Sequence, residues 1–173
     1  PPSPYAPLRL FPADRLSAAR RVILLVIDGL GEELLRHLGA DSALAACHAG
    51  TMTSVYPPTT ATAVTTLLTG RAPQQHGLTG WFVHLRRLGT VAAVLPFVSR
   101  YDNRPLVRED LGIGELIDPG SFFAGLPVPS RMLQPAMIAD SAFSRLTAGP
   151  AERHGYRSLA EFAALLGACA RGE

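Results

Sequence analysis

The sequence contains no lysine, so all of its 16 basic side chains are arginines, and with 14 acidic side chains the formal net charge is +2. The arginines are spread along the chain, and Arg20-Arg21 and Arg86-Arg87 are the only adjacent pairs. Proteins that follow a nucleic-acid backbone concentrate positive charge on one face or in one stretch. The sequence therefore argues against nucleic-acid binding.

Cysteine is also scarce. Cys47 and Cys169 are the two cysteines of the 173-residue chain, and they lie far apart in the sequence. This number and spacing fit neither a disulfide framework nor a zinc-finger motif. We expect both to be free, partly buried thiols.

Long apolar runs are absent. None approaches the roughly 20 residues that a membrane-spanning helix needs. The N-terminal stretch "PPSPYAPLRLFPADR" lacks the charged start, apolar middle and small-residue cleavage site of a signal peptide. The composition, 47% hydrophobic and 17% charged, is that of a globular domain. We therefore expect a cytoplasmic protein that does not associate with membranes.

The hydrophobic patterns alternate between strand-like and helix-like. Residues 22–27 form a continuous β-branched and aliphatic run, which is typical of a parallel strand covered on both faces. Helical patterns follow over 32–38 and 42–48, separated by Gly39, and residues 51–58 predict a second short strand that ends at prolines. A helix is then expected to begin near Thr59 and to end at Gly70. Its apolar stripe would consist of Ala61, Val64, Leu67 and Leu68.

Further along, residues 90–97 predict a third strand, and residues 129–139 predict one or two short strands. The segment 99–129 is rich in turn-forming residues and is expected to be a long loop or cap. "SLAEFAALLGACA" predicts an amphipathic helix that is capped by Ser158, with Glu161 three residues later. Together these elements predict a single α/β domain with a mostly parallel central sheet flanked by helices on both faces, preceded by a Pro-rich arm over 1–19.

Asp28 comes directly after the run 22–27. In open α/β sheets ligands bind beyond the carboxyl ends of the strands, so this position favours a functional role. Two other interpretations stay open. In the first, Asp28-Gly29 forms a turn, with the aspartate capping a helix that begins near Glu32. A dinucleotide-binding loop fits less well, because Gly29 and Gly31 lack the third glycine and follow the acid.

Thr59 and Thr60 stand where the helix ending at Gly70 is expected to begin. Either threonine can serve as an ordinary helix cap. A hydroxyl at a helix start also lies at the positive end of the helix dipole, beside backbone N–H groups that bind phosphate oxygens. A threonine in this position can act as a nucleophile if a metal ion lowers its pKa.

The stretch "VILLVIDGLG", followed by "TSVYPPTTATAVTTLLTGRAPQQHGLTGW", resembles the alkaline phosphatase superfamily, in particular its nucleotide pyrophosphatase/phosphodiesterase branch. That branch has a strand ending in Asp-Gly, a threonine nucleophile at a helix start, and then a Thr-Gly and a His-Gly. The resemblance covers roughly residues 20–100. It implies an alkaline-phosphatase-like α/β fold and metal-dependent hydrolysis of a small phosphate ester or nucleotide.

The resemblance also assigns roles to residues. Asp28 matches the first metal-ligand aspartate, and counting back from Thr69-Gly70 places the nucleophile, which also contacts a metal, at Thr60. Thr59 is the alternative if the match slips by one residue. His76 falls in a segment that is structural as far as the motif tells, so it is not assigned as a ligand.

One position departs from the family pattern. Ala63 stands where the phosphodiesterases carry an asparagine that holds the transferring phosphoryl group. This departure leaves the exact substrate class open.

The resemblance further implies two divalent metal ions, zinc with manganese as the alternative. One would activate the Thr60 oxygen and the other would generate the hydroxide that frees the product. The family supplies further ligands well after the nucleophile, including an adjacent Asp-His pair, and no such pair follows Gly77 in this sequence. We therefore expect the chain to be the N-terminal portion of a longer catalytic domain, with the remaining ligands beyond Glu173.

The later acidic and histidine residues have simpler interpretations. Asp102, Asp110 and Asp118 lie among turn-forming residues and are expected to be solvated or capping side chains. His154, in "ERHGY", is expected to be a histidine in a surface loop. None of these residues is assigned to the site.

Two other functions stay open. One is a non-catalytic relative that acts as a binding or regulatory module, and the other is a phosphomonoesterase or phosphomutase of the same superfamily. A sulfatase fits least, because neither Cys nor Ser, the nucleophiles of those enzymes, stands at position 59 or 60. The sequence leaves the substrate, the metal and the oligomeric state undetermined.

Overall fold

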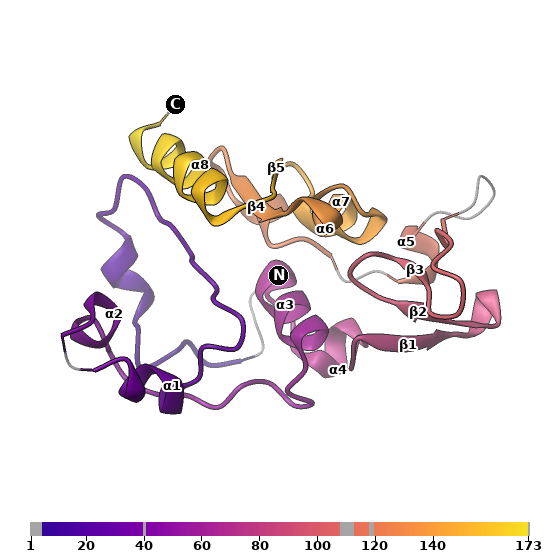
Figure 1. The fold of residues 1–173 in the computed structure, drawn as a ribbon, viewed down its shortest axis with the longest axis horizontal. Coiled ribbons are helices and arrows are strands. Elements are labelled where there is room, and N and C mark those ends of the chain that lie inside the picture. The colour runs from indigo at the N-terminus through magenta and orange to yellow at the C-terminus, as the bar shows by residue number, and fades with distance from the viewer. Residues whose placement is uncertain (1–4, 40, 108–112, 118–119, 173) are drawn as a thin grey trace. The chain divides into compact units, whose positions relative to one another are not determined.

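The computed structural model describes residues 5–39, 41–107, 113–117 and 120–172. The chain divides into two compact units, Pro1–Thr53 and Ser54–Glu173 (Figure 1). Each unit is described by itself below.

The first unit contains three short helical elements. A 3-10 helix covers Ala13–Leu16, α1 covers Glu32–His37 and α2 covers Ala43–Ala46. The Ser42 hydroxyl caps α2 by accepting a hydrogen bond from the backbone N–H of Ala45 at 3.1 Å. Both helices predicted in this part of the sequence are confirmed, although α2 is shorter than its pattern.

The strand predicted over residues 22–27 is wrong for the described part of the chain. This run forms no strand there, and its side chains are exposed by between 46% at Ile27 and 71% at Leu24. A parallel strand exists only when neighbouring strands bond its backbone and other layers cover its faces. The strand predicted over 51–58 is absent for the same reason. The apolar pattern shows that residues 22–27 could form a buried strand. No strand that pairs with them is present among the described residues.

The second unit begins with α3, Thr60–Thr69, which ends at Gly70 with a φ of +66°, and α4, Pro73–His76, follows. The predicted helix is therefore confirmed. Its buried face differs from the predicted stripe, because Leu67 is 41% exposed. The buried side chains are Ala61, Thr62, Thr65 and Thr69.

Two buried threonines of α3 donate their hydroxyl groups to backbone carbonyls of the preceding turn. Thr65 donates to the carbonyl of Ala61 at 2.6 Å, and Thr69 donates to the carbonyl of Thr65 at 2.7 Å. A hydroxyl bonded to the preceding turn has no need of water, so the side chain packs by its methyl group. The predicted stripe contained only aliphatic side chains and so omitted Thr62, Thr65 and Thr69.

Three antiparallel strands follow, in the order β1-β2-β3. They are β1, Phe82–Leu85, β2, Thr90–Ala93, and β3, Val98–Ser99, with a short 3-10 helix at Arg86–Leu88 between the first two. Leu85 pairs with Thr90. The strand predicted over 90–97 is thus confirmed only in its first half, because residues 94–97 form a turn.

The last part of the unit contains a parallel pair of strands, β4, Arg131–Pro135, and β5, Glu152–Tyr156. Between them lie α6, Ala136–Ala139, and α7, Ala142–Ala148, and α8, Leu159–Arg171, follows (Figure 1). The segment before β4 contains only α5, Ile113–Leu116, and a 3-10 helix at Phe123–Gly125 among its described residues. It is therefore the loop-rich region that the sequence predicted.

Helices cover both faces of the β4–β5 pair. Arg131 on β4 donates to the Cys169 Sγ of α8 at 3.8 Å. Gly155, which pairs with Gln134 and so belongs to the opposite face, lies against Ala136 of α6. The predicted helix-covered parallel sheet is present here on a small scale. The described chain as a whole is mixed α/β with two small sheets, one antiparallel and one parallel, and not the single parallel sheet that was predicted.

The apolar core of this unit lies beneath α3, the antiparallel sheet and α7. Its most deeply buried members include Ala61, Leu78, Ala92, Phe97 and Phe143. Ala61 of α3 belongs to this core, and Val64 and Leu68 pack against it, so the core supports α3 from its first turn.

Three local predictions can be checked in this structure. Ser158 caps α8 by accepting from the N–H of Glu161 at 3.1 Å, as predicted. Both cysteines are free, but Cys47 is exposed, whereas Cys169 is partly buried as expected. His154 lies within β5 and is half-buried, so its assignment to a surface loop is wrong.

Replacing Gly155 by alanine is expected to destabilise the unit by about 1–3 kcal/mol. A Cβ at this position would lie 3.0 Å from the Cα of Ala136 and 3.2 Å from the Cβ of Ala139, so the contact involves backbone that cannot move aside easily. Gly114→Ala is the matched control, because no atom lies within 4 Å of a Cβ there. Urea unfolding of both variants checks this. Equal stability of the two variants would contradict the close packing of α6 on β5.

Candidate active site

Asp28 lies in a tight turn. The N–H of Leu30 donates to the carbonyl of Ile27 at 3.4 Å, and Gly29 has a φ of +75°, a conformation that glycine adopts without strain. The Asp28 side chain is exposed. The interpretation of Asp28-Gly29 as a turn is confirmed. The suggestion that Asp28 caps the next helix is wrong, because α1 has Gly31 at its N-cap and no side-chain cap.

Thr59 is the N-cap of α3. Its Oγ1 accepts a hydrogen bond from the backbone N–H of Thr62 at 3.3 Å and shares a second one with the Thr62 hydroxyl at 2.8 Å. The Thr59 hydroxyl therefore already performs a structural role at the helix start.

Thr60 is the first residue of α3 and is half-buried. The backbone N–H groups of the first turn point toward this end of the helix, and the helix dipole makes it positive. No acidic side chain lies in the first turn of α3 to offset that potential. The start of α3 is therefore a suitable place for a hydroxyl that must carry negative charge or face a phosphate group.

Asp28 belongs to the first unit and Thr60 to the second. Their predicted joint role at a metal ion stays a prediction. Carboxylate and hydroxyl oxygens are suitable donors for a divalent cation, but a catalytic zinc ion takes about three protein ligands. Within residues 5–39, 41–107, 113–117 and 120–172, no group of three His, Cys, Asp or Glu side chains is arranged to hold a metal ion.

Asp102 has the turn role that was predicted for it. Its Oδ1 accepts from the backbone N–H of Arg104 at 3.3 Å, and the side chain is exposed. A hydrogen bond from Ser99 and the one from Arg104 hold the pKa of this carboxyl below its usual value, because both favour the ionised form. Asp110 and Asp118 lie outside the described residues.

His76 is buried at the end of α4 and is only 7% exposed. Its Nε2 lies 3.1 Å from the Thr66 hydroxyl, and its Nδ1 accepts from the backbone N–H of Leu78 at 3.1 Å. Burial lowers the pKa of the imidazole. These contacts agree with the interpretation of the His76 segment as structural. The contact between Thr66 and His76 was not predicted from the sequence.

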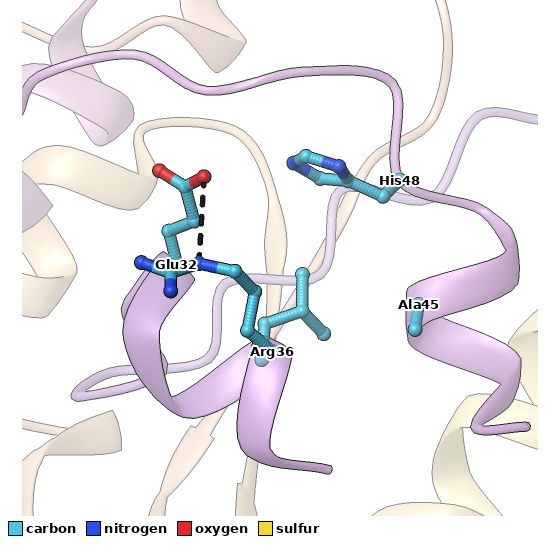
Figure 2. Close-up of a pocket in the computed structure, with 5 residues that line it drawn as sticks. Glu32, Arg36, Ala45 and His48 are labelled. Carbon is cyan, nitrogen blue, oxygen red and sulfur yellow. Dashed lines mark ion pairs between the residues drawn. The ribbon is translucent and has the colours of Figure 1, made fainter. Parts of the chain in front are cut away.

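A shallow hollow lies between α1 and α2 in the first unit (Figure 2). Glu32, Leu35, Arg36, Ala45 and His48 line it. The Arg36 Nε and the Glu32 Oε1 are 3.9 Å apart, and both side chains are largely exposed. None of the predicted site residues contributes to this hollow, and its exposed ion pair is too well solvated to provide a strong binding site.

Among the described residues, none of the helices combines the length and the apolar character that crossing a membrane requires.

Residues 22–94 match the family model described as type I phosphodiesterase / nucleotide pyrophosphatase. The resemblance drawn from the sequence is thereby confirmed over this segment, which contains Asp28, Thr60 and His76. Over these residues the chain is a relative of phosphate ester hydrolases. No curated protein and no solved structure matches the chain significantly.

Proposed function

We propose, from the similarity of residues 22–94 to the type I phosphodiesterases and nucleotide pyrophosphatases, that the protein is a metal-dependent phosphate ester hydrolase with Thr60 as its nucleophile. The observation that carries the proposal is that this match includes both the Asp28-Gly29 turn and the start of α3, in the family's order. The substrate class is a small phosphodiester or nucleotide.

The local structure favours Thr60 over Thr59 as the nucleophile. The Thr59 Oγ1 is held by its bonds to Thr62, so an attack from this oxygen would sacrifice the cap of α3. Thr60 is not needed as a cap, and it stands at the positive end of the same helix. The two threonines thus divide the structural and the chemical roles.

The proposed reaction proceeds in two displacements. The Thr60 Oγ1 attacks phosphorus and forms a P–O bond while the alcohol or nucleotide departs with the electron pair of its own P–O bond. Water then attacks the phosphothreonine, releases the phosphate product and restores the Thr60 hydroxyl. Bound divalent ions would lower the pKa of this hydroxyl and of the attacking water.

Asp28 and Thr60 are proposed to contact these ions, which would be two zinc ions, with manganese as the alternative. Two protein donors do not complete a catalytic zinc site. Further His or carboxylate ligands would be needed to complete the site. A cytoplasmic location is proposed on the sequence features alone.

The test uses the full-length protein and a nitrophenyl nucleotide ester. Hydrolysis is expected to release nitrophenolate, to stop when a chelator removes the metal, and to return when zinc or manganese is added. If neither metal co-purifies with the protein and neither raises its melting temperature, the binding or regulatory module is the better interpretation, because a ligand that binds the folded state must stabilise it.

A further inference from the structure

We propose that His76 locks α3 against the following turn as a neutral imidazole protonated at Nε2, and that taking up a second proton releases this lock. The proposal goes beyond the proposed function, because it concerns the stability of α3 and depends neither on a metal ion nor on catalysis. It assigns a pH-sensitive role to a buried group that the proposed reaction does not use.

The hydrogen bonds of His76 fix where its proton lies. The backbone N–H of Leu78 is a donor only, so the Nδ1 that it contacts at 3.1 Å must accept and has no proton of its own. The single proton of a neutral ring is then on Nε2, where it points to the Thr66 Oγ1 at 3.1 Å. The Thr66 Oγ1 accepts a hydrogen bond from this N–H, because its own hydroxyl proton is donated to the carbonyl of Thr62 at 3.1 Å.

This arrangement leaves no place for a second proton. Protonation of Nδ1 would set two donors, the ring N–H and the Leu78 N–H, against each other. Because His76 is only 7% exposed, water has little access to relieve that conflict. The lowered pKa of the buried imidazole likewise shows that the neutral ring is favoured.

No carboxylate near His76 in the chain offsets the charge of an imidazolium. α3 is the element that packs most closely on α4, and neither helix contains Asp, Glu, Lys or Arg. Arg71, in the link between the two helices, is the one charged residue over residues 60–81. The lowering of the His76 pKa has burial as its cause.

The lock reaches the functional end of α3. Thr66 joins His76 to the carbonyl of Thr62, and the Thr62 hydroxyl in turn bonds the N-cap residue Thr59. Releasing His76 therefore removes support from the helix whose first residue is Thr60.

The direction of the pH effect follows from the lowered pKa. The folded state favours the neutral ring, whereas in the unfolded chain the group titrates near its ordinary value of 6.5. The stability that His76 contributes is therefore fully present above pH 6.5 and is lost as the pH falls from there through the lower pKa of the folded state.

The first test is nitrogen NMR of the full-length protein labelled in histidine. We expect the His76 proton on Nε2 at neutral pH, and we expect His76 to titrate below its ordinary value of 6.5. A proton on Nδ1, or titration of His76 at or above that value, would overturn the proposal. This measurement needs no variant and so does not depend on one folding.

The second test compares folding stability between about pH 8 and about pH 5 in two variants that each keep one of the two bonds. His76→Asn keeps an acceptor near Leu78, and His76→Gln keeps a donor near Thr66. Each is expected to lower the folding equilibrium constant about fivefold at neutral pH for one lost hydrogen bond. Each should also flatten the loss of stability in acid, whereas His84→Asn should retain the wild-type profile. Equal pH profiles for wild type and both His76 variants would contradict the lock.

Discussion

Thr60→Ala is expected to reduce hydrolysis of a nitrophenyl nucleotide ester by the full-length protein on the order of 10³-fold or more, since loss of a covalent nucleophile leaves only binding and electrostatic effects. The fold should be unaffected, because the cap of α3 is provided by Thr59 and alanine is the better helix former. Metal content should fall less than in Asp28→Asn, because a neutral hydroxyl is a weaker metal ligand than a carboxylate. Steady-state kinetics, the thermal melting curve and metal analysis of the same preparation check the three parts.

Thr59→Ala is the matched control on the adjacent hydroxyl. Removing the cap is expected to cost about 1 kcal/mol of stability, and Thr59→Ser, which keeps the hydroxyl, should restore it. Turnover should persist in both variants. Normal turnover in Thr60→Ala together with loss of turnover in Thr59→Ala would move the nucleophile to Thr59, and normal turnover in both would remove the threonine mechanism altogether.

Asp28→Asn is expected to have the second-largest effect, lowering metal affinity and turnover by roughly 100-fold or more. Mutating a residue that hydrogen-bonds to a metal ligand typically lowers metal affinity or activity about 10- to 100-fold. Removing a direct ligand should lower them at least as much. Asn keeps the shape of the side chain and is a good turn residue, so the turn between Ile27 and Leu30 should survive. Metal titration and steady-state kinetics measure the two effects.

Asp41→Asn provides the control for Asp28→Asn. Asp41 is another exposed aspartate of the first unit, and the substitution removes the same negative charge. It should retain both metal affinity and turnover. Activity that returns to Asp28→Asn at high metal concentration would identify a ligand defect. If metal affinity and turnover stay at wild-type levels in Asp28→Asn, the carboxylate serves the turn alone.

The parts of the fold that sequence reasoning predicted correctly are those fixed by neighbouring residues. Ser158 caps the helix that it precedes, and Gly70 ends α3 in the left-handed conformation. In each case the determining contact spans only a few residues. Such contacts can be recognised from the order of residue types without knowing what lies elsewhere in the molecule.

The strands could not be predicted with the same success, because a strand depends on a partner that is distant in the sequence. Residues 22–27 have the strongest strand pattern in the chain, yet they pair with nothing in the described part. β5 has a weak pattern, interrupted by Gly155, and it forms because it pairs with β4 about 21 residues earlier, as Arg131 does with Glu152. A strong apolar pattern is therefore not enough to form a strand; a pairing partner is also needed.

For the candidate site, the order of motifs was enough to indicate the family, and the match over residues 22–94 confirms it. The proposal that Thr60 and not Thr59 is the nucleophile needed coordinates, since both are plausible helix starts and the bonds of Thr59 to Thr62 identify the cap. The hydrogen bond between Thr66 and His76 could not be predicted from the sequence either, because it joins side chains of two different helices, α3 and α4. Side-chain pairs of this kind follow from packing and not from local pattern.

The stereochemical course of hydrolysis at phosphorus tests the Thr60 mechanism most directly. With a substrate made chiral at phosphorus, attack by Thr60 and then by water gives two in-line displacements, each of which inverts the centre. The account therefore predicts net retention of configuration in the product. Net inversion would show a single direct attack by water and would contradict a covalent role for Thr60.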